Sequence, residues 1–218
     1  MTAACSHTCT SDWSKRLSAL ASAEIQEDGA HDLNHLQRVW STAQQLLADY
    51  PQADALVVQA ACFLHDIVNL PKNHPDRAQA SRLAAERACE LLRGSDFPAD
   101  KLAGVAHAIE AHSFSAAITP VTIEAQIVQD ADRLDALGAV GLARLFYTAG
   151  RMGSALAHAD DPLGEQRALD DRQYALDHIE VKLATLPATM QTQAGKKLGE
   201  TRLQWLRQFR SEFVAEWS

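Results

Sequence analysis

Two ionisable residues, His65 and Asp66, stand side by side in the run ACFLHDIVNL, whose other residues mostly favour burial. A buried carboxylate without a partner is costly, so this position requires a cation or a hydrogen-bond network. Further histidines and aspartates occur in HDLNHLQRVW and in QDADRLDALG. A divalent metal ion would supply the cation. Imidazole nitrogens and carboxylate oxygens together suit manganese, iron, cobalt, nickel or zinc, and suit magnesium less well.

Helices must position these groups, because almost every segment has the helical period and no run alternates between apolar and polar residues as a strand does. The sequence therefore predicts an all-α fold. We expect helices from Ser11 to Gly29, from Asp32 to Pro51, over 53–66, from Pro75 to Gly94, from Pro98 to His112, over 122–152 with a bend near Gly138, and over 171–185 and 189–216. The segment 153–171 is the longest irregular stretch, and it forms either a surface excursion or a flap over a site.

Length and composition indicate one domain. A chain of 218 residues, 47% of them hydrophobic and 22% charged, can bury a substantial core. We expect residues 1–10 to form a flexible tail and residues 11–218 to form the helical domain. No apolar run is long enough to span a membrane. The N-terminus lacks the basic flank and apolar core of a signal peptide, so we expect a cytoplasmic protein.

The cysteines and the net charge narrow the possible partners. Cys5 and Cys9 resemble half of a zinc site, but no second Cys/His pair follows at a useful spacing, so we expect reduced thiols and no structural zinc. The formal net charge of −8 opposes binding of duplex DNA or RNA. A small phosphorylated ligand stays compatible with this charge, because a metal and a few basic groups can dominate the field inside one cleft.

The order of three motifs, HDLNHLQRVW, then LHDIVNL, then IVQDADRLDALGAVGLARLF, resembles the HD-domain superfamily of metal-dependent phosphohydrolases. The chain is most similar to the bacterial single-domain HD proteins that include nucleotide pyrophosphohydrolases, and the resemblance covers residues 15–190. An HD dipeptide alone is weak, whereas three motifs in this order on predicted helices are specific. The resemblance implies a single-domain HD-type helical bundle that binds a divalent metal and hydrolyses a phosphoester or phosphoanhydride bond.

The resemblance places the family's metal ligands on His35, on the pair His65 and Asp66, and on Asp132 of ADRL. His31 stands one turn before His35 on the same helical face and is the alternative ligand. Any one of these histidines taken alone would more often have a structural role, but the ordered set indicates metal binding. Asp66, as ligand and hydrogen-bond acceptor, is also expected to orient the attacking water.

One departure from the family leaves the proton donor open. Some HD nucleotidases carry a glutamate three residues after the HD aspartate, where this chain has Asn69, which cannot act as an acid or base. His112, Asp135 and Lys72 are the candidates for this role. His107 and His112 fall between the HD pair and Asp132, an interval in which binuclear HD phosphodiesterases also place histidines. Residues five positions apart do not share a helical face, so joint ligation would require the helix to end between them.

Several basic groups lie near the motifs. Arg38 stands one turn after the first motif histidine and Lys72 follows the HD pair, so both are expected to contact a substrate phosphate. His112 is a further candidate for contacting the substrate or supporting a ligand. Arg77 and Arg144 are expected to be solvated surface charges.

These features predict a metal-dependent phosphohydrolase, monomeric or homodimeric, with a small phosphorylated substrate, and the resemblance favours a nucleotide. Two alternatives stay open. The first is a binuclear phosphodiesterase that holds a second metal through His107 or His112. The second is a sensor that binds a metal and a nucleotide without turnover.

Overall fold

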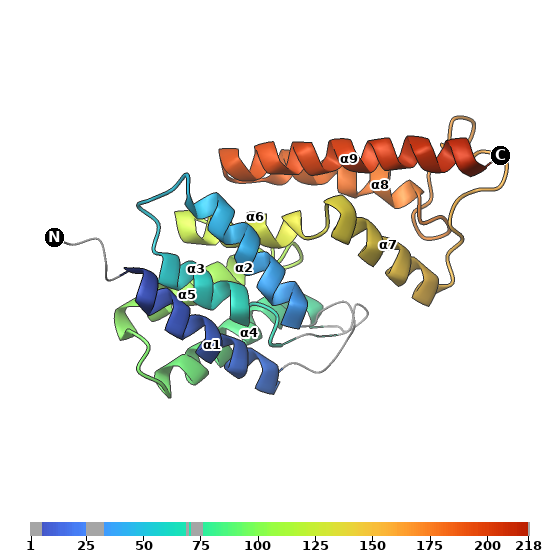
Figure 1. The fold of residues 1–218 in the computed structure, drawn as a ribbon. Helices are drawn as coiled ribbons and strands as arrows, with labels where there is room; N and C mark the ends of the chain where they lie inside the picture. Colours follow the sequence, from blue (N-terminus) through green and yellow to red (C-terminus); the bar gives the residue numbers. More distant parts are fainter. Residues whose placement is uncertain (1–5, 25–32, 69, 71–75, 218) are drawn as a thin grey trace. The chain divides into compact units, whose positions relative to one another are not determined.

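The computed structural model describes residues 6–24, 33–68, 70 and 76–217, and this part of the chain is helical, as predicted (Figure 1). The α-helices are α1 (Ser6–Glu24), α2 (Leu33–Leu47), α3 (Ala55–Leu64), α4 (Ala80–Arg93), α5 (Leu102–His112), α6 (Ile123–Leu134), α7 (Gly138–Met152), α8 (Asp177–Val181) and α9 (Gln193–Trp217). Short 3₁₀ helices are η1 (Arg77–Gln79), η2 (Ala99–Lys101) and η3 (Leu183–Thr189). These residues contain no strand, only an isolated bridge between Ala155 and Tyr174. The chain forms two compact units, residues 1–132 and residues 133–218.

Helix α3 is the centre of the first unit. Every residue from Val57 to Leu64 is buried, and α3 packs against α1, α2, α4 and α5. A helix enclosed on all sides is apolar all round, which explains why this segment has almost no polar face. His65 and Asp66 follow at its C-terminal end. The buried helix therefore places the ionisable pair at its C-terminal end, where His65 is buried and Asp66 is partly exposed.

The beginning of α3 is anchored by Asp54. Its carboxylate accepts hydrogen bonds from the backbone N–H groups of Leu56 and Val57 at 3.0 and 3.3 Å, and it pairs with the ammonium of Lys101. This is an N-cap, which satisfies amide groups that the helix leaves free. The N–H of Asp54 also donates to Glu124 Oε1 at 2.9 Å. Because Glu124 lies in the first turn of α6, this bond links α3 to the helix that carries Asp132.

Several predicted boundaries are confirmed. Helix α4 ends before Gly94, whose N–H donates to the carbonyl of Glu90, and α5 ends at His112. The predicted helix over 122–152 breaks before Gly138, which has φ +75° and opens α7. A Cβ atom at Gly141 would lie 2.2 Å from the carbonyl oxygen of Ala136, so the chain makes a close approach there that only glycine permits.

Other boundaries were wrong. Helix α1 begins at Ser6 rather than Ser11, while the predicted division into a tail of residues 1–10 and one domain stays a prediction. The predicted helix over 171–185 is reduced to α8, followed by η3. The N–H groups of Ala175 and Leu176 donate to the carbonyl groups of Ala155 and Leu156, both at 2.9 Å, so they are not available for helical hydrogen bonds and the helix begins only at Asp177.

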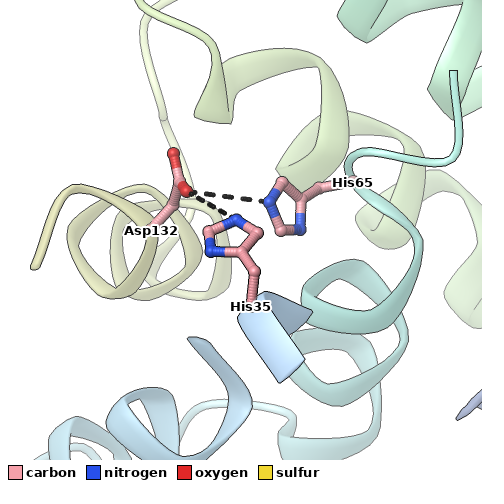
Figure 2. A group of neighbouring side chains, drawn as sticks. All are labelled: His35, His65 and Asp132. Atoms are coloured by element: carbon pink, nitrogen blue, oxygen red, sulfur yellow. Dashed lines mark ion pairs between the residues drawn. The ribbon is translucent and has the colours of Figure 1, made fainter. Parts of the chain in front are cut away.

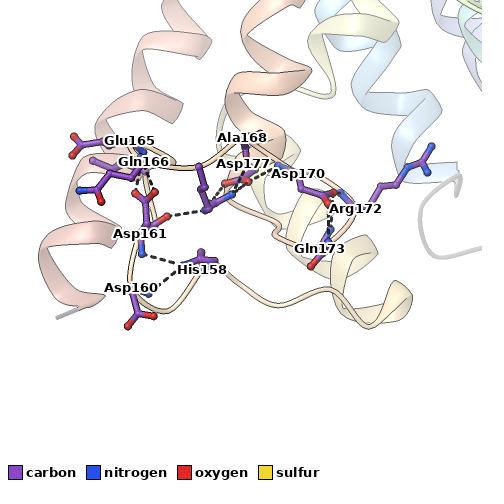
Figure 3. Close-up of polar contacts among 12 residues, drawn as sticks. His158, Asp160, Asp161, Glu165, Gln166, Ala168, Asp170, Arg172, Gln173 and Asp177 are labelled. Carbon is purple, nitrogen blue, oxygen red and sulfur yellow. Dashed lines mark hydrogen bonds and ion pairs between the residues drawn. The ribbon is translucent and has the colours of Figure 1, made fainter.

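In the second unit the segment between α7 and α8 is held by its own polar contacts (Figure 3). The guanidinium of Arg167 donates to both carboxylate oxygens of the fully buried Asp177, at 2.6 and 2.8 Å. Asp161 accepts from the N–H groups of Glu165 and Gln166, each at 2.9 Å. The predicted irregular stretch is therefore an ordered loop, and whether it acts as a flap stays a prediction.

Aromatic rings join α7 to α9 in this unit. The ring of Phe146 lies 6.0 Å from that of Phe209 and 6.2 Å from that of Phe213. The series continues to Trp217, whose ring stacks on Phe213 at 5.2 Å. Helix α9 is the longest in the described part of the chain, yet neither it nor any other described helix is long and apolar enough to cross a membrane.

Candidate metal centre

His65 presents one nitrogen of its buried imidazole without a hydrogen-bond partner. The side chain is completely buried, and Nδ1 lies 3.0 Å from the carbonyl oxygen of Cys62. A carbonyl only accepts, so Nδ1 carries a proton, and in the neutral imidazole Nε2 offers a lone pair. Within the described residues this Nε2 makes no hydrogen bond. A buried acceptor without a donor is costly, and a metal ion would satisfy it.

His35 from α2 and Asp132 from α6 converge on the same point as His65 (Figure 2). Asp132 Oδ1 lies 3.4 Å from His35 Nε2 and 3.7 Å from His65 Nε2. Asp66 approaches from the end of α3, with its Oδ2 at 3.8 Å from His35 Nε2 and 3.6 Å from His65 Nε2. Four groups from three helices or helix ends therefore meet at one centre.

These separations fit shared coordination better than direct hydrogen bonding. At 3.4 to 3.8 Å the nitrogen and oxygen atoms are farther apart than hydrogen-bonded pairs. Donor atoms that each lie about 2.1 Å from one ion are separated by roughly 3.0 to 3.5 Å at neighbouring coordination positions. Two neutral imidazoles and two carboxylates form a donor set for a borderline divalent metal. The residues present therefore fit the divalent cofactor that the sequence predicts.

The carboxylates of this centre are held in their charged form. Burial by itself would raise the pKa of Asp66, but His65 and His112 outweigh it and the pKa is lowered. At Asp132 burial is likewise outweighed, here by His35 and His65, and the pKa lies well below its usual value. Both aspartates are thus ready to bind a cation near neutral pH.

His112 extends the cluster on the other side of Asp66. It is the last residue of α5, its Nδ1 lies 2.5 Å from the carbonyl oxygen of Ile109, and its Nε2 lies 3.6 Å from Asp66 Oδ1. Burial by itself would lower the pKa of His112, but the nearby carboxylate of Asp66 outweighs this effect and the pKa is raised. His65, Asp66 and His112 form a second group whose donor atoms lie within 4.8 Å of one another. Asp66 therefore has one carboxylate oxygen near His35 and His65 and the other near His112.

His107 does not join these groups in the described part of the chain. Its Nε2 accepts a hydrogen bond from the backbone N–H of Val121 at 3.0 Å, which ties α5 to the end of the following loop. Helix α5 is continuous from Leu102 to His112, so it does not end between the two histidines as joint ligation would require. Of the two candidates for a second metal, only His112 lies at the centre.

The other predicted site residues have different positions. Arg38 lies on α2 and is partly buried, whereas Lys72 and the alternative ligand His31 fall outside the described residues. Asp135 follows α6 in the second unit, where its buried carboxylate accepts from Arg144 Nη1 at 2.6 Å. The interpretation of Arg144 as a solvated surface charge was wrong, because it neutralises this aspartate. A proton-transfer role for Asp135 stays a prediction.

The backbone carbonyls that fix the two imidazoles were not predicted. Cys62 stands three residues before His65, and Ile109 stands three residues before His112. A signal existed in both places, because each histidine ends a helix where carbonyl groups have no partner in the next turn. Each carbonyl selects the tautomer that directs Nε2 toward the cluster.

Known proteins are similar to this chain in sequence and in fold. Residues 32–137 match the HD domain family. Over 187 residues the chain is 33% identical to the uncharacterized protein YpgQ of Bacillus subtilis (strain 168), a match that covers 84% of this chain and 82% of YpgQ.

Two crystal structures are similar over almost the whole chain. An HD-superfamily hydrolase from Bacillus thuringiensis superposes with a TM-score of 0.73 and 26% identity, covering 95% of this chain and 97% of that one. Bacillus subtilis YpgQ in complex with ADP superposes with a TM-score of 0.72 and 27% identity, covering 94% and 95%. Together with the converging histidines and aspartates, these matches show that the chain belongs to the HD-domain superfamily of hydrolases.

Proposed function

We propose that this protein is a metal-dependent phosphohydrolase that cleaves a phosphoester or phosphoanhydride bond of a nucleotide. The observation that carries the proposal is that His35, Asp66 and Asp132 lie around Nε2 of His65, a buried nitrogen that makes no hydrogen bond within the described part of the chain. The crystal structure of YpgQ with ADP supports a nucleotide as the substrate class. A bound divalent ion supplies a Lewis acid that acidifies water and withdraws charge from phosphoryl oxygens.

The other proposed roles belong to side chains of the protein itself. His35, His65, Asp66 and Asp132 would hold the metal, and Asp66 would also orient the attacking water through hydrogen bonding. Arg38 and Lys72 are proposed to contact substrate phosphates, where their charge offsets the repulsion between a polyanionic substrate and an acidic protein.

His112 is the proposed proton donor to the leaving group. Its Nδ1 is held by the carbonyl of Ile109, so the ring is fixed with Nε2 directed toward Asp66. Asp135 is less suited to this role, because the guanidinium of Arg144 favours its ionised form. The variant His112→Gln should retain the metal and lose mainly kcat, since an amide cannot transfer a proton.

A second candidate is a binuclear phosphodiesterase. It is favoured by the group of His65, Asp66 and His112, which shares two residues with the first centre. Metal analysis of the purified protein distinguishes the two proposals: one equivalent of metal per chain supports the first, and two equivalents that fall to one in His112→Gln support the second.

The deciding experiment adds a panel of divalent metals and a panel of nucleotides to metal-free protein and measures phosphate and pyrophosphate separately. Asp66→Ala removes a ligand and the orienting acceptor, so turnover should fall by several orders of magnitude. Asp49→Ala, at an exposed aspartate, is the control and should retain full activity. Hydrolysis by Asp66→Ala at the parental rate would refute the proposal. Nucleotide binding without turnover in the parent would favour the sensor.

A further inference from the structure

The loop that leaves the candidate centre carries the most exposed large apolar side chain of the described residues. Phe114 is 81% exposed and stands two residues after His112. Two extended residues span at most about 7 Å, so the backbone of Phe114 lies near His112 wherever the loop runs. An aromatic ring is thus displayed in solvent beside a cluster that is otherwise polar.

The loop holds this ring in a defined turn. Ala117 has φ 52°, a left-handed conformation that residues other than glycine seldom adopt, and its N–H donates to the carbonyl of Phe114 at 3.4 Å. The hydroxyls of Ser113 and Ser115, on either side of Phe114, lie 3.0 Å apart. At the far end, the N–H of Val121 donates to His107. Strained conformations persist where the surrounding structure maintains them, and they concentrate at ligand sites.

We propose that Phe114 is a stacking surface for the base of the nucleotide whose phosphates occupy the metal centre. This inference rests on the proposed function. An exposed phenyl ring offers a flat apolar face, and a nucleobase is a flat partner that any aromatic ring can stack on without hydrogen-bond readout. The ribose joins the base to the phosphates and would bridge the interval between Phe114 and the cluster. The site would therefore accept several bases, with purines favoured by their larger overlap.

The test compares a ligand that has a base with one that lacks it. For Phe114→Ala, we expect KM for ATP to rise about tenfold or more, because base stacking contributes on this scale. The inhibition constant of inorganic tripolyphosphate, which has phosphates but no base, should stay unchanged. Phe114→Trp should restore the parental KM. The matched control is Val121→Ala, which removes an apolar side chain that is 73% exposed in the same loop.

The outcomes separate this inference from the proposed function. If the parent neither hydrolyses nor binds any nucleotide, both fail. If the parent hydrolyses ATP and Phe114→Ala has the parental KM, stacking is refuted and the proposed function stands. If Phe114→Ala weakens ATP and tripolyphosphate equally, the residue only supports the centre and stacking is likewise refuted. Metal content and melting temperature of the variant establish that it is folded.

Discussion

At the scale of single residues, the same kind of hydrogen bond to the backbone orients His65 and His112. Each ring donates from Nδ1 to the carbonyl of the residue three positions earlier, and each directs Nε2 toward Asp66. The backbone thus sets the tautomer without a second acidic side chain. A histidine oriented in this way keeps Nε2 directed at one point, whether that nitrogen binds a metal or carries a proton.

Ala117 gives a prediction at the same scale. Because its φ of 52° is unfavourable for a residue with a Cβ atom, Ala117→Gly should stabilise the fold by about 1 kcal/mol. Ala116, its neighbour, has no positive φ, so Ala116→Gly should destabilise the fold through added flexibility of the unfolded chain. Chemical denaturation of both variants measures the difference. Equal destabilisation by both substitutions would show that Ala117 is not strained.

The residues that meet at the centre could be predicted only in part. His35, His65, Asp66 and Asp132 follow from motif order, and the structure brings them together. The contact between His112 and Asp66 could not be predicted, because it depends on how the end of α5 packs beside the end of α3. Sequence spacing describes one helix at a time and says little about such contacts.

At the scale of elements, α7 contains two glycines whose replacement by alanine should have opposite effects on stability. A Cβ at Gly141 would lie 2.2 Å from the Ala136 carbonyl oxygen, so Gly141→Ala should destabilise the fold by about 3 kcal/mol. A Cβ at Gly150 would meet nothing within 4 Å, so Gly150→Ala should stabilise the helix by about 0.5 to 1 kcal/mol. Thermal unfolding monitored by circular dichroism compares the pair. A tolerated Gly141→Ala would contradict the close approach described above.

The loop between α7 and α8 depends on one buried ion pair. Arg167→Met leaves the fully buried Asp177 without its bidentate partner, so the melting temperature should fall by several degrees and proteases should cut the loop faster. Arg207→Met removes one partner of an exposed pair with Glu180 and should change the melting temperature little. Similar proteolysis patterns in both variants would mean that the loop is held by other contacts.

Helices with a continuous apolar face could be predicted from the sequence, and a helix shortened by backbone bonds to a distant segment could not. Helix α3 is apolar all round and was expected over nearly the residues it occupies. The segment 171–185 has an acceptable helical pattern, but the N–H groups of Ala175 and Leu176 donate to Ala155 and Leu156, which lie about twenty residues earlier in the chain. The N-cap at Asp54 and its link to Glu124 also went unpredicted, because the partner lies far along the chain.

At the scale of the whole molecule, removal of the metal should change the thermal stability of the fold. Without an ion, the carboxylates of Asp66 and Asp132 repel each other and His65 Nε2 makes no hydrogen bond to any described residue, so a chelator should lower the melting temperature and added metal should restore it. Calorimetry at increasing metal concentration measures this dependence. The double variant Asp66→Asn, Asp132→Asn should lose most of it. A melting curve that a chelator leaves unchanged would indicate that the protein alone satisfies these groups.

The buried nitrogen of His65 also has a consequence for the protein inside a cell. A fold that is weaker without its ion opens more often, and opened chains are the ones that proteases degrade. If the centre binds a divalent metal as proposed, the amount of this protein should therefore decline when that metal becomes scarce. Metal supply would then set the lifetime of the chain as well as its catalysis.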